Sequence, residues 1–282
     1  MELILAKAAL AGYVAACVLA VLYLFSKQER WSLGMFRLMS AGLACHLLSF
    51  GFRLAAFWAF PENRFFLPVY SFYGALSYMA MAVAFVFFVV ERAHHLGIMG
   101  AFVLPWTVAG LGGAVILADP AAAALAPALR SYWLNIHPVV IMTAYAAFSN
   151  AFGVGLALLV QERQIKSRKP TELCYRLPSL EELDNLNSRI IVWALPVLAG
   201  GIVMGGIWAH HAWGRFWNWD IKETWALITA LIYGLHVYLR RYSGIRGRRS
   251  VYLSMVGFAC VLFSFFVVNH LSELHGYLTG RG

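Results

Sequence analysis

Charged residues are scarce in this sequence. Asp, Glu, Lys and Arg make up 12% of its 282 residues, about half the share of a typical soluble domain, whereas 61% of the residues are hydrophobic. The longest polar stretch, 161–188, is too short to form a soluble domain. This composition excludes a soluble globular protein and predicts an all-α, polytopic integral membrane protein.

The cysteines lack the spacing of a redox or metal-binding motif. None of the four stands in a Cys-x-x-Cys pair, and three lie within hydrophobic runs, where a thiol behaves as a small core side chain. The fourth, Cys174, lies in the polar 161–188 stretch. We therefore expect neither a disulfide framework nor a cysteine-ligated metal.

Acidic residues are also fewer than basic ones, 13 against 22, which gives a net charge of +9. The basic residues do not indicate a nucleic-acid-binding protein, because 12 of the 22 lie in four short loops, SKQER, ERAHH, QERQIKSRK and RRYSGIRGRR. The loops between them hold little Lys or Arg. The positive-inside rule then places the basic loops in the cytoplasm and both termini on the outer side.

Eight hydrophobic runs are long enough to cross a bilayer. The expected spans are 8–26, 34–59, 68–91, 97–117, 138–160, 189–209, 221–241 and 251–272. Residues 1–282 are therefore interpreted as a single domain in a bacterial cytoplasmic membrane or its organellar equivalent. Ser179 and Glu182 have the spacing of a helix-capping box and predict a short amphipathic helix before the sixth span.

Residues 212–220 read AWGRFWNWD and join the sixth and seventh spans on the outer side. Single tryptophans at this depth are ordinary membrane anchors, but three within nine residues suggest a flat, partly polar ligand. His137 begins the fifth span and His275 follows the eighth, at the same depth. Two imidazoles facing each other across an aromatic shelf suit a haem iron, and Arg215 could meet a propionate. A quinone or another aromatic ligand fits the spacing as well.

Residues 205–240, GGIWAHHAWGRFWNWDIKETWALITALIYGLHVYLR, resemble the signature of the tryptophan-rich haem-handling family of cytochrome c maturation, in its CcsA (ResC) form. The stretches SYWLNIHPVVIMTAYAAF and GFACVLFSFFVVNHLSELHGY are similar to the two outer histidine helices of that family. The resemblance covers about 130–277 and is weaker before it. It implies that His137 and His275 are the axial ligands of an external haem b. It also implies a haem platform made of Trp213, Gly214, Arg215, Trp217, Trp219 and Asp220.

The same resemblance implies a function. The chain would bind haem and export it to the outer, periplasmic face, for thioether attachment to the CxxCH motif of an apocytochrome c. It would act as the haem-handling subunit of a holocytochrome c synthase, or haem lyase, with a ResB (CcsB)-like partner. Two alternatives stay open: a haem chaperone or regulator that does not ligate, and a transporter or quinone-binding membrane subunit.

Two further histidines lie within spans, where burial is costly and usually functional. The resemblance makes His46 and His236 candidate intramembrane haem ligands, although the position of the family's histidine in the seventh span is occupied by Tyr238 here. A hydrogen-bonded structural histidine, or a ligand supplied by the partner, would explain the same residues. Arg53, also within a span, could meet a propionate or an acidic partner, or reach outward to water.

Overall fold

The computed structural model describes the chain except for residues 27, 126–129 and 269–282, and it leaves the side chains of Leu134, Trp213 and Val268 undescribed. Its described part contains helices and loops and no strand. The long helices are α1 (Glu2–Ser26), α2 (Glu29–Phe57), α3 (Phe72–His94), α4 (Gly100–Leu117), α5 (Tyr132–Ile165), α6 (Leu180–Trp213), α7 (Ile221–Tyr242) and α8 (Arg248–Leu262). A π-helical segment, Phe263–Val268, continues α8.

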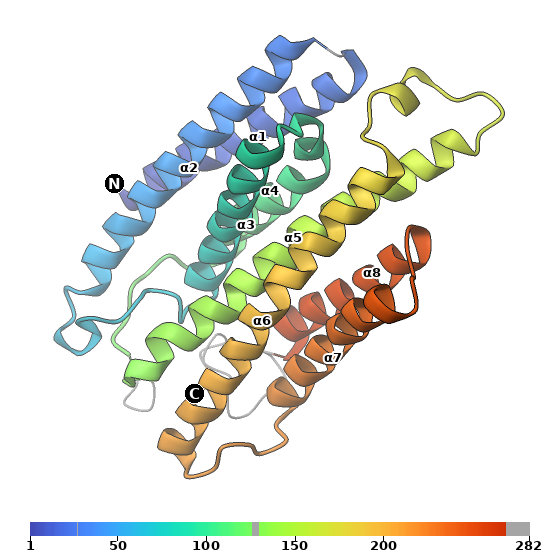
Figure 1. The fold of residues 1–282 in the computed structure, drawn as a ribbon. Helices are drawn as coiled ribbons and strands as arrows, with labels where there is room; N and C mark the ends of the chain where they lie inside the picture. Colours follow the sequence, from blue (N-terminus) through green and yellow to red (C-terminus); the bar gives the residue numbers. More distant parts are fainter. Residues whose placement is uncertain (27, 126–129, 269–282) are drawn as a thin grey trace.

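The helices confirm the all-α membrane architecture. Seven helical segments in the described part of the chain are long and apolar enough to cross a bilayer. The remaining long helix, α7, is more polar because it carries charged residues in both terminal turns. It nevertheless packs against α6 and α8 in the same bundle (Figure 1) and completes the expected set of about eight.

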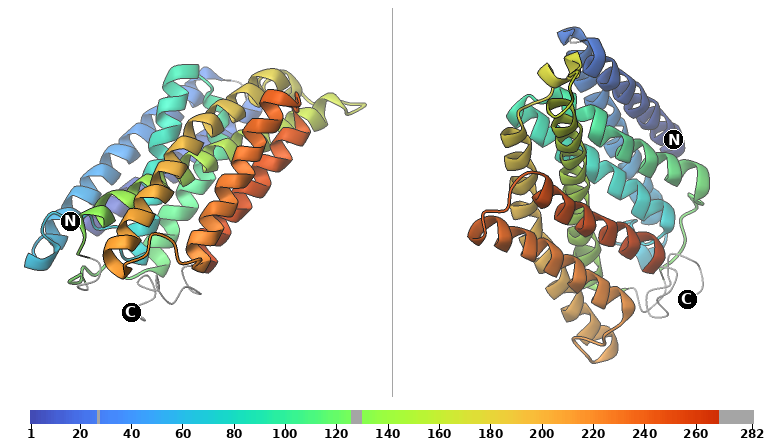
Figure 2. Two further views of the ribbon diagram at one scale, coloured as in Figure 1. Left: turned by 60° about the horizontal axis from the view of Figure 1, so that its bottom comes forward. Right: turned by 90° about the vertical axis from the view of Figure 1, so that its right-hand side faces the viewer.

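The bundle has two chemically different ends. The loops joining α1 to α2, α3 to α4, α5 to α6 and α7 to α8 lie at one end, called here the basic end. The opposite, aromatic end carries the 58–71 loop, the described part of 118–131 and the 214–220 segment. The α1–α2 hairpin lies on one side and the α7–α8 hairpin on the other, with α5 and α6 near the middle (Figure 2).

Helices α5 and α6 contain 34 residues each and are longer than the predicted spans. The capping box of Ser179 and Glu182 is present and starts α6 itself, so the amphipathic helix expected before the sixth span forms the first turns of α6 and continues directly into the span. Close packing of the two helices depends on Gly201, where a Cβ would lie 2.6 Å from Ile141 Cδ1. Glycines spaced like Gly201 and Gly205 allow helix backbones to approach closely.

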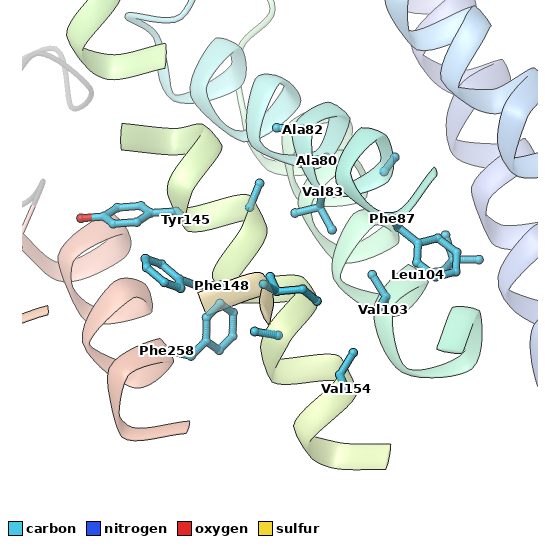
Figure 3. Close-up of a cluster of buried hydrophobic side chains, with 14 of the residues drawn as sticks. Ala80, Ala82, Val83, Phe87, Val103, Leu104, Tyr145, Phe148, Val154 and Phe258 are labelled. Atoms are coloured by element: carbon cyan, nitrogen blue, oxygen red, sulfur yellow. The ribbon is translucent and has the colours of Figure 1, made fainter. Parts of the chain in front are cut away.

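A buried hydrophobic core joins the middle of the bundle to α7 and α8. Side chains from α3, α4, α5 and α8 fill the space shown in Figure 3. Phe148 of α5 stacks on Tyr233 of α7 with ring centroids 3.7 Å apart. A Cβ on Gly257 of α8 would lie 2.7 Å from the Tyr233 ring, so this glycine makes room for the stack.

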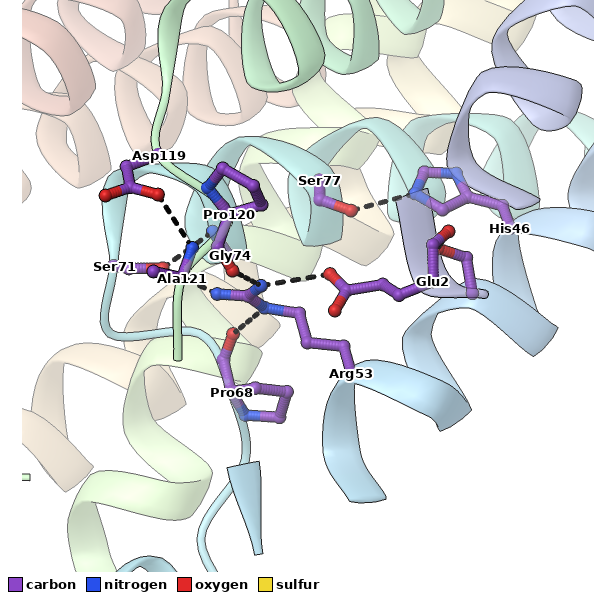
Figure 4. A network of polar contacts seen from close by, with 11 residues as sticks. Glu2, His46, Arg53, Pro68, Ser71, Gly74, Ser77, Asp119, Pro120 and Ala121 are labelled. Carbon is purple, nitrogen blue, oxygen red and sulfur yellow. Dashed lines mark hydrogen bonds and ion pairs between the residues drawn. The ribbon is translucent and has the colours of Figure 1, made fainter. Parts of the chain in front are cut away.

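Buried polar residues fix the loops at the aromatic end. Arg53 of α2 donates to Glu2 Oε1 at 3.0 Å, to the Pro120 carbonyl at 3.0 Å and to Ser71 Oγ at 2.9 Å (Figure 4). The acidic partner, one of the alternatives considered for Arg53, is therefore Glu2. Asn135 at the start of α5 accepts from the Leu67 backbone N–H, so the 58–71 loop is tied to the helix that carries His137.

Candidate functional site

A cavity of about 160 Å³ lies at the aromatic end of the bundle. Helices α5, α6 and α7 provide most of its wall, and Ser264 and Phe265 of the π-helical segment close one side. Its surface is mainly apolar, with an imidazole from His137, an indole from Trp217 and two charged groups from Lys222 and Glu223. An apolar pocket with a few convergent polar groups is the usual form of a ligand site.

His137 stands on the first turns of α5, and its orientation is fixed by α6. Its Nδ1 lies 2.8 Å from the carbonyl oxygen of Gly201. A carbonyl only accepts, so Nδ1 carries the proton, and in the neutral ring Nε2 keeps the lone pair that binds a metal. A backbone carbonyl that orients a histidine in this way is a common feature of metal sites.

Two glycines of α6 leave room for aromatic rings. A Cβ on Gly205 would lie 2.6 Å from His137 Cε1, and a Cβ on Gly206 would lie 2.5 Å from Phe216 Cζ. Any larger residue at either position would collide with the ring beside it. Phe216 therefore folds back from the tryptophan-rich segment onto α6, close to the helix face that holds His137.

Two special backbone positions shape the tryptophan-rich segment. Gly214 ends α6 in the left-handed conformation, with φ of 74°, which glycine adopts without strain. Trp219 has φ of 55° and is 71% exposed, whereas Trp217 faces the cavity. The two indoles meet edge to face with centroids 5.8 Å apart. Asp220 caps α7 by accepting from the Lys222 backbone N–H.

The indole N–H of Trp217 is buried and has no hydrogen-bond partner among the described residues. Leaving such a donor unsatisfied costs about 1–3 kcal/mol, so a polar group of a ligand is a natural partner for it. The imidazole, the indole donor, the Lys222 ammonium and the apolar wall together suit a haem, whose iron, propionates and ring need these groups. The cavity is smaller than the about 300–1,000 Å³ of typical ligand pockets, so it can enclose only part of a porphyrin.

The expected site residues are brought together only in part. His137 and Trp217 line one cavity, and Gly214, Trp219 and Asp220 hold the segment around it. Arg215 is exposed at the surface. His275 lies outside the described residues. The sequence interpretation missed Gly205 and Gly206, although two adjacent glycines one turn before His210 are a visible sign of close contact.

The two intramembrane histidines lie far apart in the bundle. His46 is fully buried between α1 and α3, where Nδ1 is 3.3 Å from Tyr13 Oη and Nε2 is 3.0 Å from Ser77 Oγ. His236 is buried in α7, and neither of its ring nitrogens has a hydrogen-bond partner among the described residues. Helices α2 and α7 lie on opposite sides of the bundle (Figures 1 and 2), so the structure does not bring these rings to one site.

Comparison with known proteins gives a consistent picture. Residues 69–275 match the family of cytochrome C assembly proteins. The cytochrome c biogenesis protein CcsA of Synechococcus sp. (strain CC9902) is 36% identical over 238 residues, which cover 74% of this chain and 77% of that protein. The protein of the same name from Gloeothece citriformis (strain PCC 7424) is 30% identical over 287 residues, covering 84% and 86%.

A solved structure is also similar. The cytochrome c haem lyase CcmF superposes on the whole of this chain with a TM-score of 0.76 and 17% sequence identity. This chain spans 49% of that structure. At this level of identity the likeness supports the fold and does not transfer individual site residues.

Proposed function

Because this chain belongs to the cytochrome c assembly family and acts in cytochrome c maturation, we propose that it holds haem at the aromatic end for covalent attachment to an apocytochrome c. One observation carries the proposal. The His137 ring borders the cavity and its Nδ1 donates to the Gly201 carbonyl, so Nε2 is the unprotonated nitrogen and the one proposed to bind iron. His275 is the proposed second axial ligand, by position in the sequence.

The surrounding residues have complementary roles in this proposal. The apolar wall and the tryptophan rings would cover the porphyrin plate, and the Trp217 N–H and Lys222 would meet propionates. Arg215, Trp213 and Trp219 would extend this platform beyond the cavity. Haem b is the proposed ligand, since its vinyl groups are the ones that form thioethers.

Thioether formation needs positioning more than it needs a protein nucleophile. The substrate brings its own two thiols, and each adds across one vinyl group: sulfur bonds to one vinyl carbon and the thiol proton ends on the other. The addition is redox-neutral and releases no leaving group. Fixing the vinyl edges beside a CxxCH segment can lower the barrier by several kcal/mol, which is the contribution proposed for this chain.

The proposal also includes a side of the membrane and a partner. By the positive-inside rule the basic loops would lie on the cytoplasmic side, so the aromatic end would face outward, on the periplasmic side of a bacterial cytoplasmic membrane. The described residues contain no soluble domain that could receive an apocytochrome. A ResB (CcsB)-like membrane protein is the proposed partner that supplies one.

Spectroscopy of purified variants tests the ligand assignment. Replacing His137 and His275 with alanine should abolish the Soret and reduced α bands while the protein stays inserted in the membrane. His94→Ala is the matched control, since His94 is exposed at the basic end and should retain haem like the parent chain. Unchanged bands in the double variant would show that these imidazoles do not hold the iron.

A second experiment separates ligation from mere haem holding. The chain is coexpressed with a ResB-like protein and an apocytochrome, and covalent haem is detected by peroxidase stain after denaturing electrophoresis. A haem-containing complex that yields no covalent product would favour a chaperone or regulator instead. Absence of iron from the purified chain would favour a quinone or another small-molecule ligand.

A further inference from the structure

A second and larger cavity, of about 670 Å³, lies at the basic end of the bundle. The last turn of α5, the loop that follows it and the first turns of α8 form its wall. Helices α5 and α8 pack against each other and bring these segments together (Figure 1). Basic and hydroxyl side chains dominate the lining, and Leu159 adds an apolar contact.

The charges around this cavity do not cancel. Arg163, Lys169 and Arg248 line it, and none of them has a carboxylate within 4.0 Å among the described residues. The one acidic residue of the lining, Glu162, is paired with Lys166. Four cations and one carboxylate leave a net charge of +3 around one hollow, and a bound anion would relieve the repulsion among the cations.

The depth of the cavity matches a lipid headgroup. Glu162 follows His137 by 25 residues of continuous helix, or about 38 Å at 1.5 Å per residue. A bilayer including its headgroups is about 40–45 Å thick. If His137 lies at the outer interface, the cavity lies at the headgroup level of the opposite leaflet.

An apolar strip leads from the cavity toward the middle of the membrane. Tyr252 lines the cavity and is 44% exposed, and Val256, one turn further along α8, is 52% exposed. Ala259 is exposed on the same helix face. The spacing i, i+4, i+7 aligns the three side chains in one row. This row forms an apolar surface for acyl chains, next to the cations and on the side toward the middle of the membrane.

We propose that this cavity binds the phosphodiester headgroup of an anionic glycerophospholipid. Arg163, Lys169 and Arg248 pair with the phosphate, and the acyl chains lie along Tyr252, Val256 and Ala259. The proposal does not depend on haem binding, so its failure would leave the function proposed for the aromatic end untouched. Basic pockets between membrane helices are known to bind acidic headgroups.

Two pairs of substitutions with the same change in charge test the site. Lys169→Gln with Arg248→Gln removes two cations from the cavity, whereas Arg168→Gln with Arg249→Gln removes two exposed cations beside it that do not line it. The full chain in neutral detergent is titrated with phosphatidylglycerol, phosphatidylcholine or inorganic phosphate, and the shift in melting temperature gives the apparent affinity. Native mass spectrometry counts the bound phospholipids.

We expect phosphatidylglycerol to stabilise the parent chain and the control pair, and the cavity pair to bind it about thirtyfold more weakly. The proposal would be overturned if both double variants bound phosphatidylglycerol as tightly as the parent chain does. It would also be overturned if the cavity pair and the control pair lost affinity for this lipid equally. Protection by inorganic phosphate at the same concentration as the lipid would assign the site to a soluble anion and would also overturn it. If the cavity pair fails to fold, Lys169→Gln alone, in a loop, should weaken binding about fivefold.

Discussion

Replacing Gly205 with alanine should dislodge the ring of His137. The added methyl carbon would lie 3.2 Å from Nε2 of the imidazole, and it would lie 2.6 Å from Cε1 and 2.9 Å from Nδ1, closer than a relaxed side chain allows. The ring must swing away from α6 or the two helices must separate. Either movement breaks the hydrogen bond from Nδ1 to the Gly201 carbonyl and releases the orientation of Nε2.

The magnitude can be estimated from three terms. Overpacking costs about 1–3 kcal/mol, and the lost hydrogen bond costs about 1 kcal/mol. The higher helix propensity of alanine returns up to about 1 kcal/mol. Gly200→Ala is the matched control, since a Cβ there meets nothing within 4 Å. Both variants share the propensity gain, so the difference in their free energies of unfolding isolates the steric and hydrogen-bond terms.

The assay compares both alanine variants with the parent chain and with His137→Ala. Haem content per purified protein is read from the Soret band, cytochrome c assembly from covalent haem stain, and the free energy of unfolding from denaturant titration. We expect Gly205→Ala to lose at least tenfold in haem retention and Gly200→Ala to behave like the parent. If Gly205→Ala retained as much haem as Gly200→Ala, haem binding would not depend on the packing of the His137 ring against Gly205.

Three further predictions concern other parts of the chain. Glu2→Ala leaves the buried Arg53 guanidinium without its carboxylate and should destabilise the fold by on the order of 3 kcal/mol, whereas Glu29→Ala, at an exposed position, should be nearly neutral in the same denaturant titration. Trp217→Phe removes a buried unsatisfied N–H, so it should leave stability unchanged or raised while haem retention falls; a parallel fall in both would contradict a ligand contact. Asp220→Ala should cost about 1 kcal/mol of stability through the lost cap, and Asp220→Asn should cost little, since asparagine caps equally well.

Much of the fold could be predicted from the sequence because hydrocarbon thickness and hydropathy together determine where helices cross a membrane. Hydropathy underestimates the length of a helix that continues beyond the hydrocarbon, because the turns outside it are polar. The first turns of α6 are polar, so hydropathy ends the span near Arg189, yet the capping box and hydrogen bonds continue the helix back to Leu180. In a similar way α5 extends past the hydrophobic run to Ile165.

The candidate site was predictable only as far as residue type and membrane depth allow. His137 and Trp217 could be assigned to one end of the bundle because both lie close to span ends. The hydrogen bond from His137 to Gly201 joins residues 64 apart on different helices, and no spacing rule specifies such a contact. The same holds for His46, whose hydrogen-bonding neighbours Tyr13 and Ser77 are 33 and 31 residues away.

The unequal lengths of the helices determine how the protein sits in a bilayer. With 18 residues, α4 reaches about 27 Å, slightly less than the hydrocarbon thickness, so nearly its whole length lies within the hydrocarbon. With 34 residues each, α5 and α6 reach about 51 Å and project beyond it. Helices α5 and α6 therefore extend from one aqueous side of the membrane to the other. A protein that binds the 166–179 loop would contact the ends of the two helices that carry His137 and Gly205, and could displace both residues.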